Sequence, residues 1–326
     1  MSKSYKLIII LFLFIFSCSK DAIIENLNDD NTYYRDGEVE IVFENDATHG
    51  INIIFMGDGY VKNELKKDQG RYREHALENI EFLFQHEPFK FYKNHFNAYI
   101  IYAESEITPH GNTFIVDTPF DSHLTTITPY SNALHPIIQD LQSVNDYVFK
   151  VKNRNRTDKD LILMSVNNVN GGTAGRYSNL AVFGNGERGT MLHEVGHAFG
   201  GLGDEYYFLN VTGTPHTDYP NMDNTDNLEI IKWKHFIGHS GYENVGAFEG
   251  GAYHQFNTWR PEEGSIMRGN TGLFNAPSRE SIVKRILQIR GLTYNFEDFL
   301  INDNPSQNRK PINLNKDIKL NNCLVE

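Results

Sequence analysis

Residues 191–206 read MLHEVGHAFGGLGDEY, and we expect the rest of the fold to be arranged around them. His193 and His197 are four positions apart, slightly more than one helical turn, so a helix presents both imidazoles on one face. Glu194 lies roughly 100° further around that helix, where its carboxylate can reach water beside a metal without binding the metal. The H-E-x-x-H spacing therefore predicts a zinc site on a helix, with Glu194 as the general base.

The other face of this helix carries an apolar stripe, which predicts that a core anchors the helix. The stripe consists of Met191, Leu192, Val195, Ala198 and Phe199. Gly196 lies inside the helix, where glycine costs roughly 1 kcal/mol relative to alanine. We therefore expect another element to approach the backbone closely at Gly196. The helix is expected to end at the glycines that follow it, Gly200, Gly201 and Gly203.

A catalytic zinc site has three protein ligands and one open position, so a third ligand is expected in the loop after the helix. The candidates are Asp204 and Glu205. In the metzincin pattern H-E-x-x-H-x-x-G-x-x-H, the third ligand falls at the position of Gly203, which has no side chain. Asp204 is favoured because a shorter carboxylate suits a tight turn after glycine, but the spacing leaves Glu205 open. A chance match to the pentapeptide is the alternative, and the glycines and carboxylates that follow weigh against it.

The segment HEVGHAFGGLGDEY resembles the signature H-E-x-G-H-x-x-G-x-L-G-D-E-Y of the bacterial IgA peptidase family of zinc metallopeptidases and fills every fixed position. Residues 51–60 (INIIFMGDGY) and 87–100 (EPFKFYKNHFNAYI) also resemble the opening of that family's catalytic domain. The resemblance implies that His193 and His197 are ligands, that Glu194 is catalytic, and that the third ligand lies within residues 203–205. It does not identify the substrate.

The N-terminus resembles a bacterial lipoprotein signal. A basic start at residues 2–6 is followed by an apolar run at 7–16, too short for a permanent membrane helix, and then by Cys18. An ordinary secretory signal is the alternative. We expect an exported protein that is lipid-anchored to the bacterial outer membrane or cell surface, with membrane contact only through Cys18. The expected organisation is a signal peptide (1–17), a tether (18–36), a catalytic domain (37–300) and a polar tail (301–326).

Composition narrows the classes of function. The formal net charge is −12 and no Lys/Arg cluster forms a phosphate-binding stripe, which argues against a nucleic-acid partner. The two cysteines, Cys18 and Cys323, exclude a disulfide framework and a cysteine zinc site. A hydrophobic content of 40% is enough for one sizeable core. We expect the single catalytic domain to be a monomer.

Alternating apolar segments predict an α/β (α+β) domain with a mixed sheet, a zinc-site helix and a metzincin-like arrangement. Expected strands include 51–56, 96–102, 161–166 and 180–183, the last beside the cleft by analogy with metzincins. Helices are expected around Ile80 and Leu83, from Ile137 to Val148, and from an N-cap at Ser278. Residues 104–128 and 167–178 are expected to be loops. Asp58 is expected to satisfy backbone amides in a turn, with a role in the site as the alternative. His110 and His123 are expected to be solvated, with contact to the metal or the substrate as the alternative.

A second informative stretch lies downstream of the helix. Residues 265–268 (SIMR) resemble the methionine turn of metzincins, which implies that Met267 forms a hydrophobic floor below the metal. The hydroxyl of Tyr253 can donate to a developing oxyanion, and a core tyrosine is the alternative. His254 beside it is a second candidate for the same role.

These features predict a secreted zinc-dependent endopeptidase that hydrolyses peptide bonds in extracellular proteins, such as IgA or other glycoproteins. The expected ligands are His193, His197 and Asp204, and the expected catalytic residues are Glu194 and Tyr253. Two alternatives remain open: a surface lipoprotein that binds zinc without catalysis, and a zinc amidase acting on cell-wall peptides. The intact Glu194 counts against the first alternative.

Overall fold

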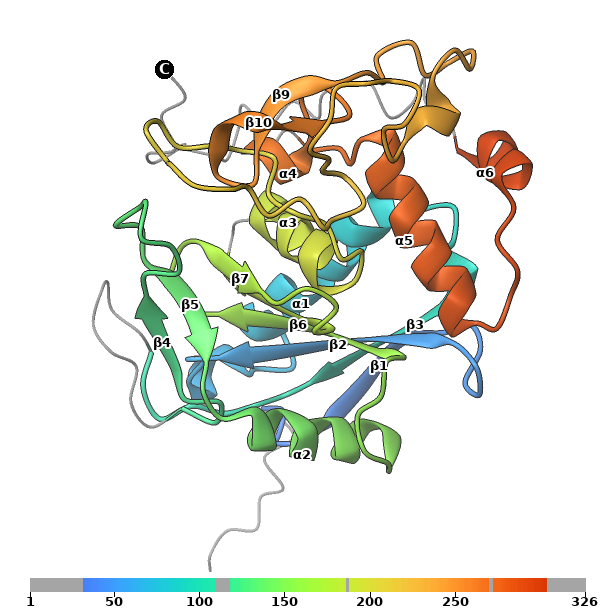
Figure 1. Cartoon of the computed structure of the whole chain (residues 1–326). Helices are drawn as coiled ribbons and strands as arrows, with labels where there is room; N and C mark the ends of the chain where they lie inside the picture. The colour runs from blue at the N-terminus through green and yellow to red at the C-terminus, as the bar shows by residue number, and fades with distance from the viewer. Residues whose placement is uncertain (1–31, 109–117, 186–187, 270–271, 304–326) are drawn as a thin grey trace, which may run out of the picture. The chain divides into compact units, whose positions relative to one another are not determined.

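The computed structural model describes residues 32–108, 118–185, 188–269 and 272–303, and its centre is a six-stranded sheet (Figure 1). The strand order is β1-β3-β2-β6-β8-β7, in which β3, β2, β6 and β8 are parallel and the edge strands β1 and β7 are antiparallel. The prediction of a mixed sheet is therefore confirmed. The strands are β1 (Val39–Glu44), β2 (Ile51–Asp58), β3 (Phe96–Ile101), β6 (Asp160–Val166), β7 (Gly172–Ala174) and β8 (Leu180–Gly184).

The interior strands are buried along their whole length because helices cover both faces of the sheet. Successive side chains of a strand point to opposite faces, so Ile53 and Phe55 join one core cluster and Ile54 joins the other. The first cluster includes residues of α1 (Arg71–Gln85), α3 (Arg188–Ala198) and α5 (Ala276–Ile289), and the second includes residues of α2 (Leu141–Lys152). Figure 1 shows α2 on the opposite side of the sheet from α1, α3 and α5.

Two helix starts differ from the predictions. Residues Ile137 and Ile138 belong to strand β5 (His135–Ile138), and α2 begins later because Asp140 Oδ1 accepts the backbone N–H of Ser143. Asn275, not Ser278, caps α5: its side chain accepts the N–H of Ser278. Both apolar patterns correctly predicted a helix, but the capping side chain decides where that helix begins.

The long loop expected at residues 104–128 contains a strand. Residues of β4 (Ser122–Thr125) pair with β5 in an antiparallel ribbon. The remaining elements are β9 (Phe248–Gly251), β10 (His254–Arg260), α4 (Ile266–Gly269), α6 (Phe296–Asn302) and the 3-10 helices η1 (Lys62–Glu64), η2 (Lys93–His95) and η3 (Lys234–Phe236). In Figure 1, α3 lies between the central sheet and the layer formed by β9, β10 and α4. The candidate site on α3 is therefore enclosed by segments from both halves of the chain.

Packed residues extend beyond the expected catalytic domain at both ends. Tyr34, placed in the expected tether, stacks on Tyr102 with 3.6 Å between ring centroids. Asp303, placed in the expected tail, forms a buried ion pair with Arg279 at 2.7 Å. The expected signal peptide, Cys18 and Cys323 lie outside the described residues, so the anchor stays a prediction. Among the residues that are described, none of the helices is long and apolar enough to cross a membrane.

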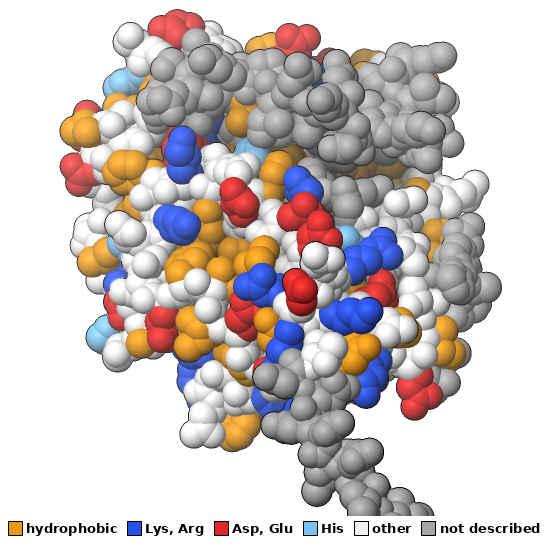
Figure 2. Space-filling view, turned by 180° about the vertical axis from the view of Figure 1, so that it is seen from behind, with side chains coloured by type: hydrophobic (Ala, Val, Ile, Leu, Met, Phe, Trp, Pro, Cys, Tyr) orange, Lys and Arg blue, Asp and Glu red, His pale blue; other side chains and the backbone are white. Residues whose placement is uncertain are grey.

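Figure 2 shows the face opposite to that of Figure 1, where Lys and Arg side chains are interspersed with Asp and Glu. Charges of both signs that alternate in this way do not form the continuous basic surface that nucleic acids require. The charges on this face therefore agree with the sequence, in which Lys and Arg do not cluster. The absence of a nucleic-acid partner stays a prediction.

Candidate metal centre

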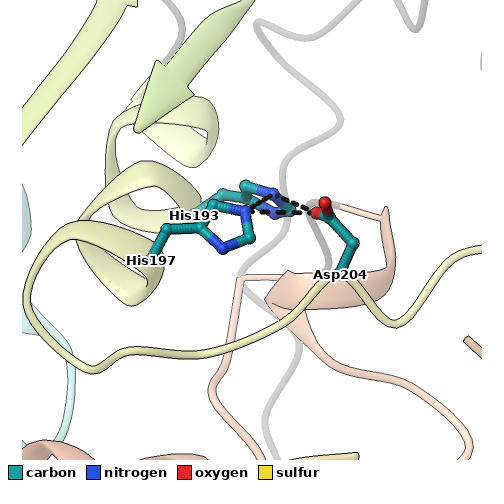
Figure 3. Close-up of side chains that lie close together, drawn as sticks. All are labelled: His193, His197 and Asp204. Carbon is teal, nitrogen blue, oxygen red and sulfur yellow. Dashed lines mark hydrogen bonds and ion pairs between the residues drawn. The ribbon is translucent and has the colours of Figure 1, made fainter. Parts of the chain in front are cut away.

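Three side chains meet at one point, as the sequence predicts. His193 and His197 project from α3 with their Nε2 atoms 3.0 Å apart. Asp204 Oδ1 lies 3.0 Å from Nε2 of His193 and 3.2 Å from Nε2 of His197 (Figure 3). Within the described part of the chain, these three residues form the group of His, Cys, Asp and Glu side chains whose geometry can hold a metal ion.

Backbone carbonyls hold both imidazoles in one tautomer. Nδ1 of His193 donates to the carbonyl oxygen of Ile266 at 2.9 Å, and Nδ1 of His197 donates to that of Leu202 at 2.7 Å. Because a carbonyl only accepts, each Nδ1 carries the hydrogen and each Nε2 is left with a lone pair. Carbonyl partners of this kind orient histidine ligands in metal sites.

The donor set fits a cation. Two imidazole lone pairs and a carboxylate oxygen within 3.2 Å of one another repel unless a positive charge lies among them. A proton on either imidazole is stabilised by the carboxylate in the same way, as the pKa values of the three groups show. Burial lowers the pKa of His193 and His197, but Asp204 outweighs burial and raises both. Burial also raises the pKa of Asp204, and the two histidines outweigh it and lower that pKa. Two imidazoles and one carboxylate are the chemistry that zinc prefers.

Asp204 reaches the histidines because the chain turns back directly after α3. Gly201 has a φ of +65°, a left-handed conformation that favours glycine. A Cβ atom at Gly203 would lie 2.6 Å from the ring of Tyr219, so this position cannot carry a side chain without displacing that ring. Ala252 N–H donates to the Asp204 carbonyl at 2.8 Å and ties the loop to the β9–β10 turn.

Glu205, the alternative third ligand, is turned away from the histidines into a buried polar network. Its Oε1 accepts hydrogen bonds from the side-chain amides of Asn221 and Asn275, at 2.8 and 2.6 Å. Its Oε2 accepts from the Ser265 hydroxyl at 2.5 Å. Burial raises the pKa of Glu205 to about 7. With both oxygens engaged, Glu205 joins three loops around the site, and Asp204 is the carboxylate that faces the histidines.

Glu194 is buried beside the edge of the sheet. A Cβ atom at Gly172 in β7 would lie 2.7 Å from Oε1 of Glu194 and 2.6 Å from the Thr190 side chain, so a larger residue there would displace these side chains. Burial raises the pKa of Glu194 to about 8. A cation held by His193, His197 and Asp204 would lower the pKa of Glu194 again, because it would stabilise the carboxylate. Glu194 thus lies next to the three converging side chains but is not one of them.

The strand beside the site is not the one that was expected. Residues 180–183 were predicted to lie along the cleft, but they belong to β8, which has neighbours on both sides. The edge strand is β7, inside the segment 167–178 that was predicted to be a loop. Its glycines permit close contact with α3, a tertiary effect that composition alone does not reveal. His135 Nδ1 donates to the Gly172 carbonyl at 2.8 Å and links β5 to this strand.

The hydroxyl of Tyr253 donates a hydrogen bond to Asp204 Oδ2 at 2.6 Å, which places this residue at the candidate centre. His254, the other candidate in this turn, has Nδ1 directed to the backbone carbonyl of Ala252 at 2.7 Å. Tyr253 adopts a φ of +68°, an uncommon conformation for a non-glycine residue. The turn between β9 and β10 therefore directs the tyrosine, rather than the histidine, to the carboxylate.

Met267 lies against the helix that carries the histidines. It is fully buried, and a Cβ atom at Gly196 would come within 2.6 Å of its sulfur. The expectation of a close approach at Gly196 is thus confirmed. The Met267 carbonyl also accepts the Glu205 N–H at 2.8 Å, so this segment supports α3 and the loop after it together.

The other polar residues from the sequence analysis lie elsewhere. Asp58 is fully buried and accepts the backbone N–H of Ser122 at 3.2 Å, the backbone role expected of it. His123 pairs with the side chain of Gln139, and His110 lies outside the described residues. Sequence reasoning missed Tyr206, whose ring stacks near His193 with 6.4 Å between centroids. The sequence feature that could have identified Tyr206 is its position directly after Asp204 and Glu205.

The structure is a mixed α/β domain in which two histidines and an aspartate can hold a metal ion and a buried glutamate lies on the helix of the histidines, an arrangement typical of metal-dependent hydrolases. A family model described as IgA Peptidase M64 matches residues 39–242, more than half of the chain. The protein therefore belongs to this peptidase family. The match includes α3 and Asp204 and ends before Tyr253 and Met267. No curated protein matches the chain.

Proposed function

We propose that this protein is a secreted zinc-dependent endopeptidase that cleaves extracellular proteins, with IgA and other glycoproteins as candidate substrates. The observation that carries the proposal is the convergence of His193, His197 and Asp204 beside the buried Glu194. Membership of a peptidase family supplies the reaction class. Export and a lipid anchor at Cys18 are proposed from the sequence of the N-terminus, and we propose a monomer without a nucleic-acid partner.

The edge strand β7 supports the binding of an extended peptide. Gly171 accepts a backbone bond from Gly184 of β8, so in an antiparallel ladder the backbone groups of Gly172 and Ala174 point away from β8. His135 engages the outer carbonyl of Gly172. A substrate strand can pair with the other backbone groups of Gly172 and Ala174 that point away from β8, and such a strand would pass beside Glu194. This pairing uses the backbone of the substrate and does not depend on its side chains.

In the proposed reaction, the Glu194 carboxylate takes a proton from the attacking water and later passes it to the leaving amine. A zinc ion held by His193, His197 and Asp204 supplies Lewis-acid polarisation of the scissile carbonyl and makes water more acidic. Tyr253, 2.6 Å from Asp204, lies where its hydroxyl can turn toward the developing oxyanion. Met267 supports the helix from below in the manner proposed for a metzincin-like methionine turn.

The test is to measure metal content and proteolysis together on protein that begins at Ser19. The substrates are a panel of unfolded proteins, mucin and IgA, each assayed with and without a chelator. We expect one zinc per chain and cleavage that the chelator abolishes and added zinc restores. Bound zinc without cleavage of any substrate would favour a surface-binding lipoprotein, and a chain that binds no zinc would refute the proposal.

A further inference from the structure

Aromatic side chains from three chain segments form a continuous surface that begins at the candidate metal centre. Tyr206 lies near His193, and its ring centroid is 5.5 Å from that of Tyr253 and 5.7 Å from that of Phe208. The Phe208 and Tyr253 rings are 6.0 Å apart. These distances lie within the range in which aromatic rings attract one another.

A fourth ring arrives from a distant part of the chain. Tyr130 lies in the loop between β4 and β5, and its centroid is 6.1 Å from Phe208 and 6.3 Å from Tyr253. Figure 1 shows this loop extending from the β4–β5 ribbon toward the segments that follow α3. We call Tyr130, Tyr206, Phe208 and Tyr253 the aromatic surface.

The aromatic surface is accessible. Tyr130 is 44% exposed, and the other three rings are neither fully buried nor fully exposed. Leu209, which follows Phe208, is 60% exposed. A cluster formed only for packing would bury its outermost ring, whereas Tyr130 is 44% exposed and the side chains of His193, His197 and Asp204 are 10–13% exposed.

The segments that supply the aromatic surface also lack charge. Residues 126–134 (TITPYSNAL) and 206–213 (YYFLNVTG) contain no Lys, Arg, Asp or Glu, in a chain where 22% of residues are charged. An uncharged aromatic surface binds apolar groups and leaves a charged group poorly solvated. Its ligand is therefore expected to be neutral and apolar.

We propose that the aromatic surface is a specificity subsite that binds an aromatic side chain of the substrate peptide next to the scissile bond. The proposal rests on the proposed function for the identity of the ligand as a peptide. The connection to the scissile bond follows from Tyr253, which belongs to the aromatic surface and donates to the candidate ligand Asp204. Edge-to-face contacts with Tyr130 and Phe208 would then favour Phe or Tyr over small residues.

The test measures peptide binding apart from cleavage. The full exported chain, loaded with zinc and carrying Glu194→Gln to prevent turnover, is titrated by calorimetry with two peptides that differ only in Phe or Ala at one position. The Phe position is moved along the peptide in a series. We expect the Phe peptide to bind about tenfold more tightly at one position.

The variants assign the preference to the aromatic surface. Tyr130→Ala and Phe208→Ala should each reduce the ratio of the affinities for the Phe and Ala peptides by about threefold to tenfold. Phe149→Ala is the matched control, since Phe149 is 49% exposed on α2, across the sheet from the candidate centre. A Phe preference that survives both Tyr130→Ala and Phe208→Ala would overturn the proposal, as would equal binding of both peptides.

Failure of the subsite and failure of the proposed function give different results. If the protein with Glu194 intact cleaves peptides but shows no Phe preference, the subsite is wrong and the peptidase proposal stands. If the Phe preference is present and depends on Tyr130 but no peptide is cleaved, the aromatic surface still binds an aromatic residue of a peptide and the peptidase proposal fails. Sugar rings also stack on aromatic side chains, so binding of monosaccharides in place of the Phe peptide would overturn the subsite for an aromatic residue.

Discussion

The Tyr253 hydroxyl donates a 2.6 Å hydrogen bond to Oδ2 of Asp204, while Oδ1 of the same carboxylate faces His193 and His197. Removing this hydroxyl in Tyr253→Phe should lower zinc affinity roughly tenfold, because partners that orient a ligand contribute about 10- to 100-fold. If the hydroxyl also stabilises the oxyanion, kcat at saturating zinc should fall about 100-fold. Zinc titration and steady-state kinetics separate the two effects. Unchanged values in both would remove Tyr253 from the site.

The two neighbouring carboxylates are predicted to differ in their effect on zinc. Asp204→Ala should lower zinc affinity more than about 100-fold, beyond the loss expected for an indirect partner. Glu205→Gln keeps the size of the side chain, and its oxygen can still accept from Asn221 and Asn275, so zinc should still bind. Competition with a chromogenic chelator measures both constants. Full zinc occupancy in Asp204→Ala would move the third ligand to Glu205.

The Glu194 variants test its role as a base. Glu194→Gln should retain zinc and the fold but lose about 10²- to 10⁴-fold in kcat, the usual contribution of a general acid–base. The Glu194 side chain is not one of the three candidate metal ligands, so its replacement by glutamine leaves the metal-binding atoms in place. Metal analysis, circular dichroism and kinetics are measured on the same preparation. Normal turnover in this variant would refute the mechanism.

Gly196→Ala should destabilise the protein although alanine favours helices. The gain in helix propensity is about 1 kcal/mol, whereas the new methyl group meets the sulfur of Met267 at 2.6 Å and the ring of Phe274 at 2.9 Å. Overpacking of this kind costs about 1–3 kcal/mol. Urea unfolding at constant zinc concentration measures the balance. Gly264→Ala is the control, because an added Cβ there meets no atom within 4 Å.

The buried Asp58 should make stability depend on pH. Burial raises its pKa above the ordinary value of 3.8, so the stability that the protonated form contributes is present below pH 3.8 and is lost as pH rises through the higher folded pKa. Asp58→Asn cannot lose a proton. Its stability relative to the native protein should therefore rise between pH 4 and pH 7, by about 1.4 kcal/mol for each unit by which the pKa is raised.

The control for this experiment is Asp158→Asn, which removes the same charge at an exposed position. Urea unfolding of all three proteins is compared at several pH values with the same zinc concentration. A constant stability difference between Asp58→Asn and the native protein across this range would show that Asp58 keeps the same pKa on folding.

Local patterns were enough to predict the helix that carries the two histidines and the interior strands. The four-residue spacing of His193 and His197, the apolar stripe beside them and Gly196 all act within a few turns of one helix. The buried strands were visible as short apolar runs for the same reason. The start of α5 was missed because a single side chain, Asn275, competes with Ser278 for the cap.

The sequence by itself determined the two histidines and the glutamate, because the period of a helix sets which of its side chains share a face. Only the tertiary structure decided between Asp204 and Glu205. Their positions differ by one residue, and the choice depends on Asn221, Ser265 and Asn275, which reach Glu205 from distant loops. The edge position of β7 and the approach of Tyr130 are decided in the same way, because contacts between remote segments leave no local pattern.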